Sequence, residues 1–145
     1  MSTTHRRTRR RPGENRERLL EAGLVEFGLF GYHGASTSSI AARADVPQPH
    51  VYANFETKQQ LFLACFERLG EQLTAYPSER PSESLLRFLY QSVASSAAPG
   101  LQRSMRGPLL ELSASLGESR FDSLLAAGAR ALLEVQPDPR PGARA

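Results

Sequence analysis

The side chains best suited to molecular recognition lie close together in residues 48–54, a segment that contains no acidic residue. Its hydrogen-bonding groups belong to Gln48, His50, Tyr52 and Asn54. On a helix that turns by about 100° per residue, Val51 and Phe55 would face a core, and the outer face would present Pro49, His50 and Ala53. Such a polar face, without the Glu–Lys pairs of an ordinary solvated helix, suits a major groove beside phosphates.

Catalytic chemistry is not indicated. The three histidines (His5, His33 and His50) and the one cysteine, Cys65, show no nucleophile–base pattern and no metal-ligand spacing. The sequence contains no glycine-rich phosphate loop. We therefore expect a protein that is not an enzyme and that holds no metal and no cofactor.

The spacing of apolar residues, glycines and prolines predicts helices throughout and no strand, so the expected class is all-α. The predicted helices are 14–30, 38–44, 48–54, 58–76, 82–98, 103–114 and 118–135, with the sixth interrupted or started by Gly107-Pro108. Gly31 is expected to stop the first helix, and Ser36 or Thr37 can cap the second. Two short helices joined by a turn at 45–47, after a longer helix, form a helix-turn-helix pattern.

Apolar faces and composition divide the chain further. Buried faces are predicted from Leu20, Leu24 and Phe27 in the first helix and from Phe62, Cys65, Phe66, Leu69, Leu73 and Tyr76 in the fourth. The predicted organisation is a flexible basic arm at 1–13, a helix-turn-helix domain at 14–58, a helical domain at 59–136 and an unstructured proline-rich tail at 137–145.

Positive charge is concentrated near the N-terminus. Residues 1–58 hold nine basic and six acidic residues, whereas residues 59–145 hold nine of each. Five arginines and no acid lie within residues 1–11. This distribution indicates an anionic partner for the first part of the chain, the alternative being a solvated tail that aids solubility.

Localisation follows from what the sequence lacks. No apolar run approaches the roughly 20 residues that a membrane span needs, and no apolar region follows the arginine-rich N-terminus as in a secretory signal. The lone Cys65 cannot form an internal disulfide and is expected in the core. We expect a cytoplasmic protein with no membrane contact.

Residues 18–61 resemble the DNA-binding domain of the TetR family of bacterial repressors. The matching positions are Leu19-Leu20, Ala22, Phe27, Gly31-Tyr32, Ser36-Thr37-Ser38, Ile40-Ala41, Asp45-Val46, Val51-Tyr52, Phe55, Thr57-Lys58 and Leu61-Phe62. The resemblance implies a three-helix DNA-binding domain followed by a ligand-binding and dimerisation domain. It also implies a transcriptional repressor released by a small hydrophobic effector.

Carried over by position, the resemblance implies residue roles. Thr37, Tyr52 and Lys58 would contact phosphates, the first at a helix N-terminus where free N–H groups attract anions. The residues facing base edges would be Gln48, Pro49 and His50, with Ser38 and Asn54 as additions. Structural alternatives stay open: a plain helix cap at Thr37, a half-buried ring at Tyr52, a solvated side chain at His50 and a surface charge at Lys58.

Two features depart from the family pattern. Pro47 stands where serine or threonine usually caps the recognition helix, and with Pro49 it is expected to push Val46 and Gln48 out of helical angles. The recognition helix should therefore begin at Gln48 or later. The helices also end near Val135, before those that usually form the dimer, so the second domain is expected to be incomplete.

Assembly remains open between two arrangements. One short recognition helix reads only a few base pairs, so we expect double-stranded DNA with a palindromic operator and two protein copies. We favour a homodimer through residues 103–135, where an apolar stripe needs cover: Phe121, Leu124, Leu125 and Leu132. The alternative is a monomer that pairs only on DNA. The competing functions are a helical protein-interaction module and a non-functional remnant of a longer regulator.

Overall fold

The computed structural model describes residues 10–136, and the regular structure in that range is entirely helical. The helices are α1 (Glu14–Gly34), α2 (Thr37–Ala44), α3 (Pro49–Asn54), α4 (Lys58–Ala75), α5 (Glu83–Ser95), α6 (Gln102–Leu116) and α7 (Glu118–Leu133). The predicted all-α class is confirmed over this range. The predicted tail at 137–145, and the predicted arm apart from residues 10–13, lie outside the described residues.

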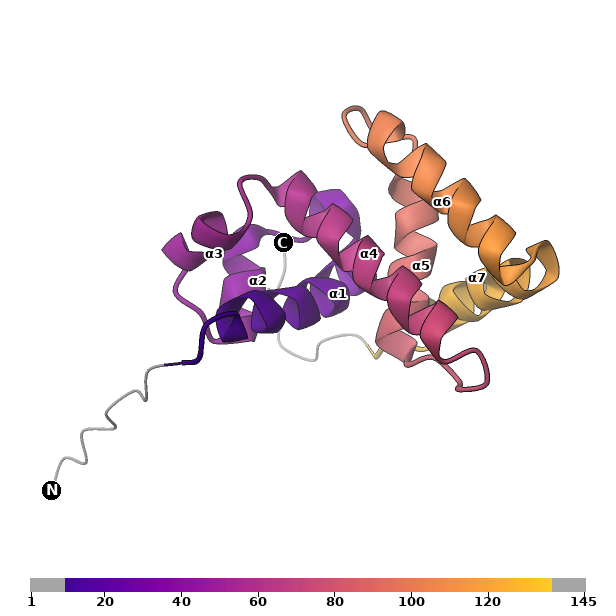
Figure 1. The fold of residues 1–145 in the computed structure, drawn as a ribbon, viewed down its shortest axis with the longest axis horizontal. Helices are drawn as coiled ribbons and strands as arrows, with labels where there is room; N and C mark the ends of the chain where they lie inside the picture. Colours follow the sequence, from indigo (N-terminus) through magenta and orange to yellow (C-terminus); the bar gives the residue numbers. More distant parts are fainter. Residues whose placement is uncertain (1–9, 137–145) are drawn as a thin grey trace, which may run out of the picture.

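The helices form two groups, and α1 connects the first group to α4 and α5. Helices α1, α2 and α3 lie together at one end, α6 and α7 lie at the other, and α4 runs between them (Figure 1). Helix α1 packs on α2, α4 and α5, and α5 in turn packs on α7. The helix-turn-helix is therefore attached to the second half of the chain through packed helices.

An aromatic cluster joins α1, α4 and α5. Phe27, Phe62 and Phe88 are fully buried, and the ring centroids of Phe27 and Phe88 lie 5.0 and 5.2 Å from that of Phe62. The Tyr32 ring packs edge-on against Phe62, with 5.2 Å between centroids. Burying each such side chain stabilises the fold by about 1.5–3 kcal/mol, so the cluster is a major link between the two groups of helices.

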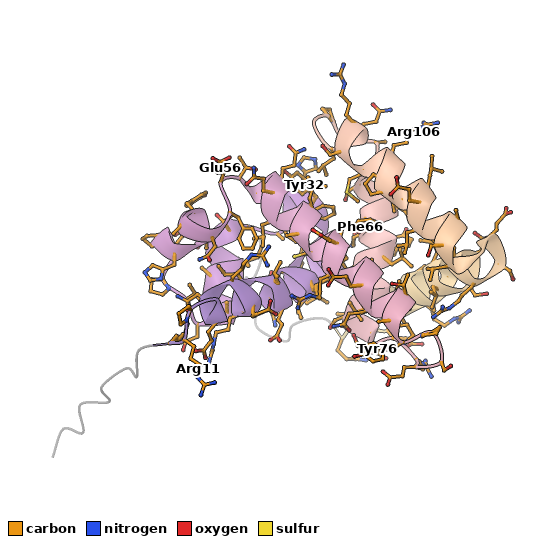
Figure 2. All side chains as sticks on the ribbon, in the orientation of Figure 1. Arg11, Tyr32, Glu56, Phe66, Tyr76 and Arg106 are labelled. Atoms are coloured by element: carbon orange, nitrogen blue, oxygen red, sulfur yellow. The ribbon has the colours of Figure 1, made fainter. Side chains whose placement is uncertain are left out.

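Most of the predicted buried faces are confirmed, including Leu20 and Leu24 in α1 and Cys65 in α4. Tyr76 is an exception, because it lies just beyond the last turn of α4 and is 57% exposed. Figure 2 shows Phe66 within the molecule and Tyr76 at the far end of the same helix. The prediction of Tyr76 as a core residue was wrong because the helix ends one residue earlier.

Two predicted boundaries are settled by backbone geometry. Gly31 adopts a φ of 77°, a left-handed conformation that favours glycine, and the regular part of α1 is interrupted there as predicted. In α6 the helix runs continuously through Pro108 and begins at Gln102, so Gly107-Pro108 neither starts nor divides it.

The apolar stripe of α7 is partly covered within the chain. Its four predicted members, Phe121, Leu124, Leu125 and Leu132, are each intermediate in exposure. Gly128 is buried against the Leu86 carbonyl of α5, which shows how closely these helices approach.

Among the described helices, none combines the length and apolar character that crossing a membrane requires.

Candidate nucleic-acid interface

The helix-turn-helix is built by capping and burial. Ser36 caps α2, its hydroxyl accepting the Ser39 N–H at 3.0 Å, which leaves the Thr37 hydroxyl available for another partner. Asp45 ends α2 at a φ of 54°, a left-handed conformation that aspartate tolerates better than most side chains. Ile40 of α2 and Val51 of α3 are buried at 0 and 1% exposure and hold the two helices to the core.

The start of α3 agrees with the predicted start at Gln48 or later, but the backbone angles of Gln48 differ from the prediction. The helix begins at Pro49, but Gln48 has helical angles (φ −53°, ψ −39°) and was not displaced by the following proline. The His50 N–H donates to the Pro47 carbonyl at 2.9 Å and the Val51 N–H to the Gln48 carbonyl at 3.0 Å, so a helical turn forms across both prolines. Pro49 is tolerated because a residue at the first helical position needs no N–H donor.

Thr37 and Tyr52 meet where α2 and α3 approach each other. Their hydroxyl oxygens lie 3.2 Å apart in a hydrogen bond. Tyr52 is 53% exposed, so its ring is not a core residue. Two of the predicted phosphate contacts therefore lie together at the surface, one from each helix of the motif.

His50 belongs to a chain of hydrogen bonds that reaches the N-terminal end of α1. Its Nδ1 lies 3.1 Å from Nδ2 of Asn15, and Oδ1 of Asn15 accepts a hydrogen bond from Nη1 of Arg10 at 2.9 Å. Nη2 of Arg10 donates to the Asp45 carbonyl at 2.7 Å and also lies 3.3 Å from the Asp45 carboxylate. The recognition helix, the turn and the beginning of α1 are thereby connected.

The remaining predicted base-facing residues are exposed around this network. Gln48, Pro49 and Ser38 all lie at the surface. Asn54 is exposed too, but its amide nitrogen donates to the His50 carbonyl at 2.8 Å. This hydrogen bond gives a partner to a backbone carbonyl within α3 itself. Asn54 is consequently less available for bases than the sequence prediction assumed.

Lys58 lies apart from the other predicted contacts, at the start of α4. Its Nζ sits 4.7 Å from the centre of the Tyr32 ring, a cation–π arrangement. Burial lowers the pKa of Lys58 below its ordinary value, because desolvation disfavours the charged form. Lys58 is therefore a packed residue in this structure, which the sequence did not indicate.

Several arginines near the motif are engaged by acids. Arg43 Nε lies 3.0 Å from a carboxylate oxygen of Glu26, which is only 3% exposed, and this pair ties α2 to α1.

Residues 10–58 hold six basic and six acidic residues, so the net positive charge of the N-terminal part is contributed by Arg6, Arg7 and Arg9.

Sequence reasoning missed Arg10 and Asn15 as parts of this surface. Arg10 was assigned to a flexible arm, and Asn15 was not singled out at all. Both contact partners that are 35 residues away in the sequence. Helical periodicity describes one element at a time, so no sequence signal could have indicated these contacts.

Comparison with known proteins supports the helix-turn-helix assignment. Residues 19–65 match the family described as bacterial regulatory proteins, tetR family. The uncharacterized HTH-type transcriptional regulator YdgC of Bacillus subtilis (strain 168) is 41% identical over 49 residues, covering 34% of this chain and 25% of that protein. The HTH-type transcriptional activator FasR of Mycolicibacterium smegmatis is 39% identical over 72 residues, covering 49% of this chain and 33% of that protein.

A solved structure extends the likeness beyond the motif. A crystal structure from Mesorhizobium loti MAFF303099, described as a TetR-family transcriptional regulator, aligns with a TM-score of 0.51 at 21% identity, covering 86% of this chain and 71% of that chain. At this identity the likeness shows the fold alone. The chain matches only a quarter to a third of the length of the two sequence relatives. Residues 19–65 therefore form a helix-turn-helix domain that matches the tetR family of bacterial regulatory proteins.

Proposed function

We propose that the chain binds double-stranded DNA in a sequence-specific manner, with α3 in the major groove. The observation that carries this proposal is the exposed face of α3, where Gln48, Pro49 and His50 stand beside the Thr37–Tyr52 hydroxyl pair. An α-helix fits the major groove, and the edges of the bases there carry a distinct pattern of donors and acceptors. The face contains no acidic side chain, so it meets no repulsion from the phosphates.

The contacts divide into two classes. Thr37, Tyr52 and Lys58 are proposed to bind phosphates, which supplies affinity without sequence preference. Gln48, Pro49 and His50, with Ser38 and Asn54 as lesser contributors, are proposed to face base edges: glutamine pairs with adenine, and the proline ring packs against a thymine methyl group.

The test is selection of bound duplexes from random DNA, followed by fluorescence anisotropy on the selected site and on a scrambled duplex. Gln48→Ala or His50→Ala should cost about 1–3 kcal/mol on the selected site and relax preference at one or two base pairs. If no duplex is bound even at low salt, a protein-interaction module or a non-functional remnant becomes the better description. Poor soluble expression would favour the remnant.

Three arginines precede the described residues, namely Arg6, Arg7 and Arg9. We propose that they bind along the minor groove and so raise the affinity for DNA. Deleting residues 1–9 would remove Arg6, Arg7 and Arg9 but leave Arg10 and its contacts in place. We expect weaker binding, mainly at low salt, because exposed charges are screened as salt rises. If the deletion leaves DNA binding unchanged, residues 1–9 do not contact DNA and serve only to keep the protein in solution.

The regulatory direction is proposed as repression, relieved by a small hydrophobic effector bound by residues 59–136. FasR, which shares sequence with this chain, is described as an activator, so the direction needs its own test. A reporter gene downstream of the selected site should be transcribed less when the chain is expressed. Increased transcription would reverse the assignment.

Two copies on a palindromic site are proposed because one short recognition helix reads few base pairs. Leu110 of α6 and Leu133 at the end of α7 are 61 and 85% exposed, so apolar surface is available in this half for contact with a second copy. Sedimentation equilibrium should detect self-association at micromolar concentration. A clean monomer that pairs only on DNA would instead support assembly on the operator.

A further inference from the structure

We infer that Asn15, held in place by Arg10, fixes the tautomer of His50 and so makes its outward nitrogen, Nε2, a hydrogen-bond donor toward DNA. Asn15 and Arg10 are positioning residues in this scheme, and His50 is the residue that touches the base. The last step, donation to a base, rests on the proposed function. The tautomer itself can be measured without DNA.

The orientation of the Asn15 amide follows from Arg10. A guanidinium carries only N–H donors, so the amide atom that lies 2.9 Å from Arg10 Nη1 must be the acceptor Oδ1. The opposite orientation would place two donors against each other. Arg10 is itself held by the Asp45 carbonyl and carboxylate, so it cannot easily turn to suit a flipped amide.

The tautomer of His50 follows from the amide. With Oδ1 used by Arg10, the atom facing His50 at 3.1 Å is the NH₂ group, which can only donate. Nδ1 of His50 must therefore accept, and in a neutral imidazole the proton then resides on Nε2. His50 is exposed, and within residues 10–136 no side chain forms a hydrogen bond with Nε2.

A fixed donor restricts which base edge His50 can read. In the major groove guanine presents two acceptors, N7 and O6, and thymine presents one acceptor, O4, beside its methyl group, whereas cytosine presents an amino donor and adenine presents both kinds of group. A donor at Nε2 is thus best matched by guanine and is mismatched to the cytosine amino group. We expect guanine at the base pair whose preference depends on His50.

The direct test is NMR of the full chain labelled with ¹⁵N at histidine, at pH 8. Wild-type His50 should show Nδ1 without a proton and Nε2 with one. In Asn15→Asp the facing group can only accept, so Nδ1 should become protonated and its ¹⁵N shift should move accordingly. His33 is exposed and is not part of this network, so its signals should stay unchanged and serve as the internal control.

Folding of the variant can be controlled. Residue 15 lies in the first turn of α1, where an added negative charge is favourable, so Asn15→Asp should keep the helix. Asn15→Leu is a second variant that removes the donor without adding a charge, and it should lead to a mixture of the two tautomers. A protonated Nδ1 in the wild-type protein, or an Nδ1 signal that Asn15→Asp does not change, would overturn the inference.

A double-mutant cycle on the selected DNA site tests the consequence. Asn15→Ala and His50→Ala should each weaken binding by on the order of 10-fold and relax preference at the same base pair. The double variant should bind about as weakly as His50→Ala alone, because Asn15 acts through His50. Additive losses would assign Asn15 to general support of the motif and overturn its role in readout. If no duplex is bound at all, the proposed function fails, and the NMR result still decides whether Asn15 sets the tautomer.

Discussion

The hydroxyl of Thr37 in α2 and that of Tyr52 in α3 are hydrogen-bonded, with 3.2 Å between their oxygens. Each hydroxyl carries one proton, and one hydrogen bond uses one of the two. The pair therefore retains one proton that it can donate to a phosphate oxygen. It also fixes the position of the exposed Tyr52 ring relative to the N-terminal end of α2.

Removing the Tyr52 hydroxyl should weaken DNA binding uniformly. We expect Tyr52→Phe to cost about 1.5–3 kcal/mol, the usual range for a hydrogen bond to a charged group, on selected and scrambled duplexes alike. Anisotropy titrations at constant salt measure this loss. Tyr76→Phe is the matched control, since Tyr76 is also exposed but lies at the far end of α4. A change in the selected sequence would place Tyr52 among the residues that read bases.

Lys58 should contribute one phosphate contact. Each neutralised phosphate adds about 0.9 to the slope of log affinity against log salt, so Lys58→Met should lower that slope by roughly one. To reach a phosphate, the ammonium group must shift from its place over Tyr32. An unchanged slope would make the lysine a packing residue only. In that case Lys58→Met should still lower the free energy of unfolding, by about 0.5–1 kcal/mol, through the lost cation–π contact.

Local patterns were sufficient to predict the elements and most of the core. Val51 and Phe55 were assigned to the buried side of the recognition helix from their spacing, and they are 1 and 5% exposed. Burial repeats with the helical period, so it can be read along a single element. The same reasoning placed Cys65 in the core, where it is fully buried.

Contacts between elements could not be predicted in this way. The Arg10–Asn15–His50 chain depends on how α1 is placed against α3, and no periodicity encodes that placement. The backbone at Gln48 was predicted wrongly because the proline rule describes an average preference, whereas here hydrogen bonds from the next turn hold the residue in helical angles. Lys58 was predicted as a phosphate contact or a surface charge, and its packing on Tyr32 was missed because Tyr32 lies in another helix.

The packing of α7 on α5 should depend on Gly128. A Cβ atom at this position would collide with the Leu86 carbonyl, and a backbone atom cannot move aside cheaply. We expect Gly128→Ala to lower the free energy of unfolding by about 1–3 kcal/mol, as overpacking does elsewhere. Gly107→Ala is the control: it lies in α6 with nothing within 4 Å of the added atom. That change should be neutral or stabilising by up to about 1 kcal/mol, because alanine favours helix. Equal losses in urea denaturation would contradict this account.

The Glu17–Arg68 pair should make stability depend on pH in the acid range. Arg68 donates two hydrogen bonds to the Glu17 carboxylate, at 2.8 and 2.7 Å, and so joins α1 to α4. These bonds, together with the positive charge of Arg68, hold the pKa of Glu17 below its ordinary value of 4.5. Folding therefore favours the ionised form. The stabilisation is fully present above pH 4.5 and is lost as the pH falls below 4.5 through the lowered pKa.

Glu17→Gln should remove this contribution. The Glu17 side chain is 50% exposed, so solvent screens the pair and the loss at neutral pH should be only about 0.2–1 kcal/mol. Urea denaturation at a series of pH values should show the two proteins differing at neutral pH and converging as the carboxylate is protonated in the acid range. Glu67→Gln is the control, because Glu67 is an exposed acid of α4 without a described ion pair, and its curve should follow the wild type throughout. A constant difference between Glu17→Gln and wild type at every pH would show that the substitution acts through packing and not through the charge of Glu17.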